Sequence, residues 1–488
     1  MKNKKMTYDV DECPPIGKWI VLALQHVFAM FGATILVPIL VNSAAGEEVL
    51  TIPVALVSSG IGTLIYILCT KGKSPVYLGS SFAFIAPLIA AYLKGGISGA
   101  MTGIMTVGLV YVVFAIIVKL IGKNWTNKLL PPVVIGPMIM IIGLGLAPSA
   151  ISQIGITAGS QIQWQTLVVA LVSFLVTAIV AVAAKGFLKV IPFLIGIVSG
   201  YLTAIAVGIV NFSPLAEAGI VGMPNFVIPF IHYTPNFSAV LTIAPIALVT
   251  MAEHIGDHTA LGAIINRDLL REPGLDRTLL GDGIATFFAG LIGGPANTTY
   301  GENTSVVGMT KVASVWVIAL AAIIAIILGF FTKFTALVST IPNAVLGGVS
   351  LLLYGFIAVN GLKVLIQNQV DFNDIKNVIV ASAMLVLGLG GAAISIVSGD
   401  LSITISGMSL AAIVGIILNL CLPSNVEVNV YRDAQIEETE KQSKKTTTKK
   451  QAKKVANKTP TKSTTKKQTI TKTATPTKKK TVKKEENV

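Results

Sequence analysis

Uncharged, mostly apolar runs recur along this chain, and they constrain its fold more strongly than any other feature. Residues 191–210, for example, contain no charged side chain. Runs of about 18 apolar residues or more are typical of helices that cross a membrane. Charged residues make up 12% of the chain and the mean hydropathy is +0.77, whereas a soluble domain carries roughly 25% charged residues. The sequence therefore predicts an all-α polytopic membrane protein.

The net charge of +14 belongs to the C-terminal tail. Residues 441–488 hold 17 Lys and 2 Glu, a net of +15, so the remaining 440 residues sum to −1. The charge therefore indicates no nucleic-acid partner. Because residues 441–488 include no aromatic residue and cannot bury a core, we expect a disordered Lys/Thr-rich cytoplasmic tail over 423–488. Two interpretations of the tail stay open, a solvated extension and a segment that contacts anionic lipid head groups.

The cysteines and the N-terminus predict no disulfide framework and no removed leader. Cys13, Cys69 and Cys421 are far apart and follow no metal-ligand spacing, so we expect neither a disulfide framework nor a Cys-rich metal site. The N-terminal residues 1–15 show no cleavage site after a short apolar core, so we expect no removable signal peptide.

Fourteen hydrophobic segments can be counted along the chain. The third and the tenth segments in chain order are short and rich in Gly, Ser and Thr. The segments are 17–41, 50–70, 77–94, 98–121, 130–147, 165–184, 187–211, 238–258, 278–292, 298–310, 314–332, 335–358, 376–397 and 402–422.

Lys and Arg residues lie mostly in alternate loops, which predicts the orientation of the segments. Loops 42–49, 148–164 and 212–237 contain neither Lys nor Arg. The loops between them are basic, and only Lys94 and Lys333 fall on the unexpected side. With fourteen segments, this pattern predicts a multi-pass protein of the cytoplasmic membrane with both termini in the cytoplasm.

The two halves of the chain resemble each other. Residues 130–147 align with residues 341–358, so the fifth segment matches the twelfth. The matching residues are Pro131, Val134, Gly136 and Ala147 in the first copy and Pro342, Val345, Gly347 and Ala358 in the second. A period of seven segments is odd, so the second copy is inserted upside down, and such 7+7 inverted repeats are typical of transporters. The predicted parts are 1–14 (cytoplasmic N-terminus), 15–211 (first repeat), 212–237 (extracellular connection), 238–422 (second repeat) and 423–488 (tail).

One hydrophobic segment carries four titratable groups within six positions, namely Glu253, His254, Asp257 and His258. An ionisable side chain in mid-membrane costs about 2.5–3.5 kcal/mol or more, so it indicates function. Helical spacing places Glu253 over Asp257. Repulsion and desolvation would make at least one acid hold a proton more tightly than a free acid, as a proton-coupled carrier requires. Alternatively, the helix ends here at the cytoplasmic surface, and Asp257 and His258 are simply hydrated.

Two segments in corresponding positions contain helix-breaking residues. Gly, Pro, Asn and Thr are dense in 293–311, and Gly79, Ser80 and Ser81 interrupt 75–84. Irregular backbone at membrane depth persists only inside protein or along a cavity. Interrupted segments in both halves therefore indicate the binding site, with Glu302 at the start of a half-helix. The alternative is a glycine-rich packing contact between helices.

The chemistry of these groups suggests a ligand. Carboxylates of Glu253 and Glu302 accept hydrogen bonds, and backbone N–H groups freed at a helix break donate them. Phe82 and Tyr300 offer aromatic faces. A flat molecule with alternating N–H and C=O groups, such as a pyrimidine-dione, complements this set. An inorganic anion would face two carboxylates, and an amino acid or sugar explains the pattern less well.

Four stretches carry a resemblance to a known family. They are QHVFAMFGATILVP (25–38), YLGSSFAFIAP (77–87), AEHIG (252–256) and NTTYGEN (297–303). With them, residues 14–422 resemble the nucleobase–cation symporter 2 family, also called nucleobase–ascorbate transporters, and within it the branch that carries uracil.

The resemblance implies proton-coupled uptake of a nucleobase without a cofactor or a metal, by a protein that is often a homodimer. It implies a core domain (segments 1–4 and 8–11) and a gate domain (segments 5–7 and 12–14). Glu253 and Glu302 would accept the N–H groups of the base, and backbone at Phe82 and Gly301 would contact its oxygens. Ser81 and Tyr300 complete the predicted substrate site. Glu253, Asp257 and His258 form the predicted proton-coupling group, and the supporting residues are Gln25, His26, Asn303 and Thr310.

Two positions depart from the family pattern. Asp257 stands where the uracil branch has a histidine, with His258 next to it, and Ser305 stands where the family signature has glycine. Glu302 favours uracil, because xanthine and urate carriers resemble a Gln version at this position.

Three other functions are alternatives to uracil uptake. A permease for xanthine or another oxopurine of the same family is the nearest. His254-x-x-Asp257-His258 also resembles an inverted zinc-hydrolase motif with Asp in place of Glu, but an intramembrane metallohydrolase would need a third ligand and a water. A passive channel would need charged rings or repeated pore motifs, which the sequence does not show.

Overall fold

The computed structural model of the chain describes residues 6–122, 125–159, 161–237, 240–398 and 401–423. The chain divides into two units, Met1–Ser424 and Asn425–Val488, and all of the described residues belong to the first. The predicted tail over 423–488 therefore lies outside the described residues, apart from Pro423.

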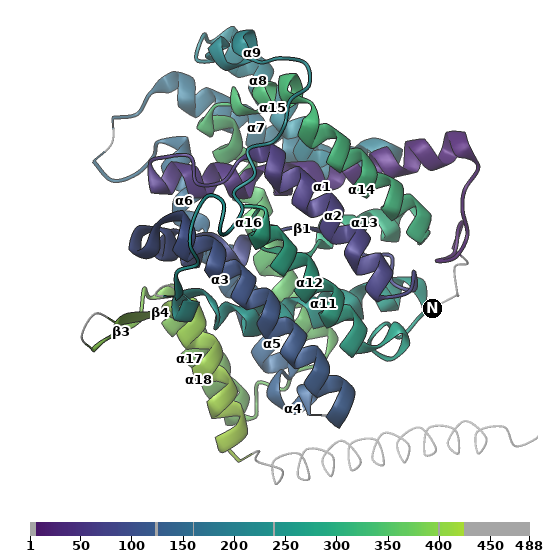
Figure 1. Cartoon of the computed structure of the whole chain (residues 1–488), viewed down its shortest axis with the longest axis vertical. Helices are drawn as coiled ribbons and strands as arrows, with labels where there is room; N and C mark the ends of the chain where they lie inside the picture. The colour runs from purple at the N-terminus through teal and green to yellow at the C-terminus, as the bar shows by residue number, and fades with distance from the viewer. Residues whose placement is uncertain (1–5, 123–124, 160, 238–239, 399–400, 424–488) are drawn as a thin grey trace, which may run out of the picture. The chain divides into compact units, whose positions relative to one another are not determined.

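Six helical stretches within the described ranges are long and apolar enough to cross a membrane (Figure 1). They are α1 (Ile16–Ala45), α2 (Ile52–Cys69), residues 82–121 with η1 (Phe82–Phe84) and α3 (Ile85–Ile121), residues 132–154 with α5 (Pro132–Gly145) and α6 (Ala147–Ile154), α7 (Trp164–Ala183) and α16 (Asn343–Gln367). A seventh is formed if α14 (Val315–Phe330) and α15 (Thr332–Ser339), bent by 81°, are one span. Helices suit a membrane because they satisfy their own backbone hydrogen bonds.

The other described elements are shorter or less apolar. They are α4 (Thr126–Leu129), η2 (Gly186–Val190), α8 (Pro192–Ala206), α9 (Ser213–Glu217), α10 (Val240–Ile243), α11 (Ile246–Ile265), η4 (Leu270–Gly274), α12 (Leu275–Leu291), α13 (Gly301–Thr310), α17 (Ile375–Leu389), α18 (Gly407–Cys421), β1 (Leu78–Ser80), β2 (Asn297–Thr299), β3 (Ala393–Ser398) and β4 (Leu401–Ser406). Every predicted hydrophobic segment overlaps a helix, and the number of membrane crossings stays a prediction.

The segment with the acidic cluster extends further than its predicted end at residue 258. α11 begins after Pro245 and continues to Ile265. Glu253 and Asp257 therefore lie in the middle of a helix, not at its end. Hydropathy placed the boundary too early because the charged residues lower it, although the helix continues through them.

Three further predicted segments have wrong boundaries. The predicted segments 376–397 and 402–422 each include part of an antiparallel hairpin, in which β3 pairs with β4 and Ile394 lies opposite Ile405. Here Ile and Val alternate with Ser and Thr, and a period of two favours strands over helices. The predicted segment 335–358 combines the end of α15 with α16, because Pro342 separates the two helices and α16 continues to Gln367.

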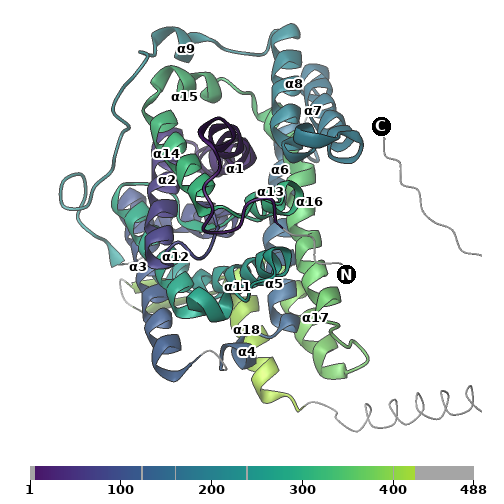
Figure 2. The same cartoon turned by 90° about the vertical axis from the view of Figure 1, so that its right-hand side faces the viewer.

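The packing of α12 shows how the helices that carry the site are held together. α12 packs against α3 and α2, while α1 contacts α13 and α14 (Figures 1 and 2). Gly108 of α3 and Gly283 of α12 let these two helices approach closely, since a Cβ on Gly108 would lie 2.5 Å from the backbone nitrogen of Phe287 in α12. Small residues let the backbones of membrane helices approach in this way. A second group packs α16 against α5, α6 and α7, and α17 against α18.

The described part of the predicted N-terminal segment 1–14 is built into the fold. The backbone of Thr7 donates to the carbonyl of Lys311 over 2.7 Å, and Ala313 donates to Tyr8 over 2.9 Å. Val10 is fully buried, and Arg267 bonds Asp9 over 2.9 Å. These contacts join the residues before α1 to the chain that follows α13.

Candidate substrate site between the interrupted segments

The two interrupted segments meet as a short antiparallel ribbon. β1 pairs with β2, with Gly79 opposite Thr298. Ser81 donates its backbone N–H to Ala296 over 2.9 Å, and Tyr300 donates to Tyr77 over 3.1 Å, so the pairing extends at both ends. Stretches far apart in the sequence, each rich in helix-breaking residues, are thus brought into direct contact.

A helix begins directly after each strand of this ribbon. Phe82 is the first residue of η1, which leads into α3, and Gly301 is the first residue of α13. The first N–H groups of a helix have no partner within it, and the helix dipole makes this end partially positive. The predicted backbone contacts at Phe82 and Gly301 therefore lie at two helix starts, with Glu302 in the first turn of α13.

One face of α11 turns its acids toward the ribbon and α13. Asp257 Oδ2 accepts a hydrogen bond of 2.6 Å from Thr299 Oγ1 in β2. A Cβ placed on Gly301 would lie 4.0 Å from Asp257 Oδ1. Glu253 lies one turn earlier on the same helix, and its Oε2 is buried without a partner among the described residues. The helix that bears Glu253 and Asp257 thus approaches the start of α13, which bears Glu302.

The other face of α11 holds a separate polar cluster. His254 Nδ1 lies 2.8 Å from Asp282 Oδ2 in α12, and both side chains are fully buried. His258 Nδ1 lies 2.7 Å from the carbonyl of His254, and its Nε2 lies 2.5 Å from Tyr66 Oη in α2. A carbonyl only accepts, so His258 Nδ1 carries a proton, and the Tyr66 hydroxyl itself donates to Ser74 Oγ over 2.9 Å. His258 therefore turns toward α2, away from Asp257.

Tyr300 and Ser81 occupy different surroundings. The hydroxyl of Tyr300 donates to the carbonyl of Ser80 and lies 3.1 Å from Thr34 Oγ1. Its ring covers Gly79, where an added Cβ would lie 2.3 Å from the ring. Tyr300 thus holds the ribbon against α1. Ser81 is buried, and its Oγ has no partner within the described ranges.

Of the four predicted supporting residues, three lie beside the site and one lies away from it. Asn303 Nδ2 donates to the carbonyl of His26 over 3.1 Å and lies 3.1 Å from its Nδ1, which joins α13 to α1 beside the site. Gln25, the neighbour of His26, has a buried Oε1 without a partner in the described part. Thr310 donates to Val306 at the far end of α13. A ten-residue helix is about 15 Å long, so Thr310 lies away from the site.

Sequence reasoning missed two residues near the site. The ring of Tyr354 in α16 meets Phe82 edge-on, with centroids 6.0 Å apart. Asp282 interrupts an apolar segment between two glycines, and an ionisable residue there was a usable signal. Tyr354 had no such signal, because a single Tyr in an apolar helix does not show which element it meets.

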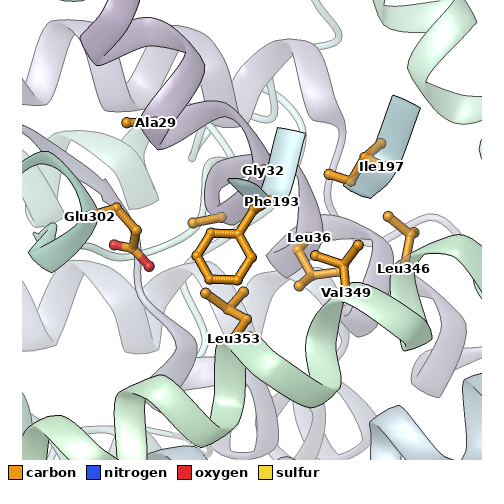
Figure 3. A pocket seen from close by; sticks show the side chains of 10 residues that line it. Ala29, Gly32, Leu36, Phe193, Ile197, Glu302, Leu346, Val349 and Leu353 are labelled. Atoms are coloured by element: carbon orange, nitrogen blue, oxygen red, sulfur yellow. The ribbon is translucent and has the colours of Figure 1, made fainter. Parts of the chain in front are cut away.

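Glu302 also lines a small cavity, whose other lining residues are apolar or glycine (Figure 3). They are Ala29, Gly32, Ala33 and Leu36 of α1, Phe193 and Ile197 of α8, and Leu346, Val349 and Leu353 of α16. Phe193 projects between α1 and α16, with Glu302 and Leu353 beside it (Figure 3). The space open to the centre of a water-sized sphere is about 10 Å³, which is room for about one water molecule.

The fold is that of known membrane transporters. It is similar to the transmembrane domain of the cyanobacterium bicarbonate transporter BicA, with a TM-score of 0.52 and 15% sequence identity over 81% of this chain and 97% of that one. Among the described residues, no group of three or more His, Cys, Asp or Glu could hold a metal ion.

Sequence comparison then gives the family. Residues 17–397 match the model of the xanthine/uracil permeases, described as a permease family. The uracil permease of Bacillus caldolyticus is 48% identical over 435 residues, which are 88% of this chain and 98% of that protein. The uracil permease of Escherichia coli (strain K12) is 42% identical over 417 residues, or 84% and 92% of the two chains. The chain belongs to this permease family, the nucleobase–ascorbate transporters, which confirms the resemblance.

Membership in this family distinguishes a transporter from an enzyme. The chain is a transporter rather than an enzyme, so the metallohydrolase interpretation is set aside. It is a multi-pass protein of the cell membrane.

Proposed function

We propose that this protein takes up uracil across the cytoplasmic membrane together with a proton, by alternating access. The observation that carries the proposal is the approach of α11, which bears Glu253 and Asp257, to the start of α13, which bears Glu302, beside the helix start at Phe82. The names and high identity of the two uracil permeases support the choice of substrate.

The ligand chemistry follows from the groups at this place. Uracil presents N–H donors, which the carboxylates of Glu253 and Glu302 accept, and carbonyl oxygens, which accept from backbone N–H groups at the helix starts. Phe82 and Tyr354 meet edge-on and supply aromatic surface for the ring. The carboxylates would repel an anionic substrate, so a neutral heterocycle with donors on its edge is the better match.

The carboxylates of the proposed substrate site also provide a place for the coupled proton. Glu253, Asp257 and Glu302 bring three carboxylates together in a sheltered place, and like charges there repel. One bound proton relieves this repulsion, so proton binding and substrate binding are coupled through the same acids. Glu253 and Asp257 would take the proton from the outside, and His258 would contribute by fixing α11 to α2. The coupling ion is H⁺, and the transport cycle uses no cofactor.

The proposal includes the arrangement of the chain in the membrane. Fourteen segments form two inverted repeats of seven, with segments 1–4 and 8–11 as core and the others as gate. In support, α5 and α16 both begin after an extended proline, Pro131 and Pro342, at matching positions of the two copies. The basic loops favour cytoplasmic termini. A homodimer, and contact of the tail with anionic lipids, complete the proposal.

The test is uptake of radiolabelled uracil into proteoliposomes that hold the full chain. We expect accumulation when the outside is acidic relative to the lumen, and competition by unlabelled uracil in preference to xanthine or hypoxanthine. Accumulation that ignores the pH gradient would contradict proton coupling. Stronger competition by xanthine than by uracil would assign the protein to the oxopurine carriers instead.

A further inference from the structure

The apolar cavity beside Glu302 adjoins the proposed substrate site. Glu302 belongs to both, and Leu353 also lines the cavity (Figure 3). Leu353 is the sequence neighbour of Tyr354, which contacts Phe82. A ligand whose N–H is held by Glu302 therefore has the part of its ring next to that N–H close to the cavity.

We infer that this cavity receives the apolar C5–C6 edge of the bound pyrimidine and limits the size of the ring that the carrier accepts. The inference rests on the proposed function. Uracil has its N–H and C=O groups on one side of the ring and two C–H groups at C5 and C6. When Glu302 accepts the N1–H, the adjacent C6 and C5 face the apolar lining, where no hydrogen bond is lost.

The size of the cavity makes it selective. It has room for about one water-sized group, which is similar in size to a methyl group or a halogen. A one-atom substituent at C5 therefore fits, whereas the second ring of a purine adds several heavy atoms at this edge and does not. Selection for pyrimidines over oxopurines thus comes from the apolar side of the site as well as from Glu302.

Gly32 allows the cavity to be narrowed without distortion. A Cβ on Gly32 would lie 3.5 Å from Ile197 Cδ1 and 4.0 Å from Phe193 Cβ, which are ordinary contact distances. Gly32→Ala should therefore fold and place a methyl group in the cavity. Gly355→Ala is the matched control, because a Cβ on Gly355 in α16 meets no atom within 4 Å.

A substitution at Val349 enlarges the cavity instead. Val349 lines the cavity and is 3% exposed, so Val349→Ala removes two methyl groups from its wall. Val345→Ala is the matched control, because Val345 is fully buried on the same helix and does not line the cavity.

The experiment measures competition of radiolabelled uracil uptake by unlabelled uracil, thymine and xanthine in proteoliposomes. One methylene in an apolar pocket changes discrimination by about 10- to 200-fold. We expect Gly32→Ala to raise the thymine-to-uracil ratio of half-inhibitory concentrations at least about tenfold, and Val349→Ala to lower the xanthine-to-uracil ratio by a similar factor. Both controls should match the unaltered protein.

This design distinguishes failure of the inference about the cavity from failure of the proposed function. If uracil uptake is retained and neither Gly32→Ala nor Val349→Ala changes its ratio, the cavity does not face the ring and the inference is overturned. If the unaltered protein itself does not take up uracil, the proposed function fails instead. Should Gly32→Ala reduce the amount of folded protein, Val349→Ala and its control decide the question alone.

Discussion

The two faces of α11 carry ionisable groups in opposite situations. On one face, Glu253 and Asp257 turn toward the ribbon and α13, and Glu253 Oε2 has no partner in the described structure. On the other face, His254 and His258 are fully buried and paired with α12 and α2, respectively, while His254 Nε2 and Asp282 Oδ1 have no partner in the described structure. Four neighbouring residues of one helix are thus divided between a place that can receive a ligand and a place that joins helices.

The difference shows which groups are available for transport. Only the carboxylate face turns toward the ribbon and the helix starts at Phe82 and Gly301, so a ligand held there can meet Glu253 and Asp257. The hydrogen bonds of the histidine face link α11 to its neighbours and stabilise the fold. Substitutions on the histidine face should therefore lower stability, and substitutions on the carboxylate face should lower uptake.

The largest effect is expected from Asp282→Ala, which leaves His254 buried without its partner. Breaking a buried pair from one side costs about 3–5 kcal/mol. Thermal unfolding of the detergent-solubilised protein should show this loss of stability, while the folded fraction should still bind uracil. If the variant keeps its stability but no longer binds uracil, Asp282 belongs to the binding groups, and the two faces of α11 do not differ in role.

Glu302→Gln should have the next largest effect, on uptake and not on stability. Hydrogen bonds to charged groups contribute about 1.5–3 kcal/mol, so uracil uptake should fall roughly 10- to 150-fold, or preference should shift toward oxopurines. The measurement is initial uptake at matched amounts of folded protein. Unchanged uptake together with unchanged preference would rule out the role assigned to Glu302.

Glu253→Gln should abolish accumulation driven by a pH gradient, because the amide cannot bind and release the proton. We expect exchange of external for internal uracil to be less affected than accumulation, which separates coupling from movement of the carrier. Uracil uptake that still follows an imposed pH gradient in this variant would show that the proton is carried elsewhere.

Tyr66→Phe sharpens the comparison from the histidine face. It removes the hydroxyl that lies beside His258 Nε2 and donates to Ser74, which should cost about 1–3 kcal/mol of stability and leave the pH dependence of uptake unchanged. The check pairs a thermal melt with uptake at several external pH values. An altered pH dependence at unaltered stability would return His258 to the proton-coupling group.

The smallest effect is expected from Thr310→Ala. Its hydroxyl donates to Val306 at the end of α13 that is remote from Glu302. Loss of one such hydrogen bond costs about 0.5–1.5 kcal/mol, and the affinity for uracil, measured by equilibrium binding, should not change. A clear loss of affinity would mean that the far end of α13 communicates with the site.

Much of the architecture could be predicted from local sequence. The apolar runs, the helix-breaking residues at 79–81 and 293–299 and the acids at Glu253 and Glu302 are properties of short stretches, and each was visible without a structure. The errors also have local causes. The charged cluster made α11 look shorter than it is, and the alternating stretch that forms β3 and β4 was counted as part of two hydrophobic segments.

By itself, the sequence determined that this chain lies in a membrane, that two of its segments are interrupted, and which acids stand near the interruptions. These conclusions depend on hydropathy, backbone preference and spacing, which act over a few residues. Only the tertiary structure decided that His258 faces Tyr66 and not Asp257, that Tyr354 meets Phe82, and that α1, α8 and α16 leave a cavity beside Glu302. The physical reason is that side-chain direction and close packing depend on which helices become neighbours, and partners far apart in the chain leave no mark in the local pattern.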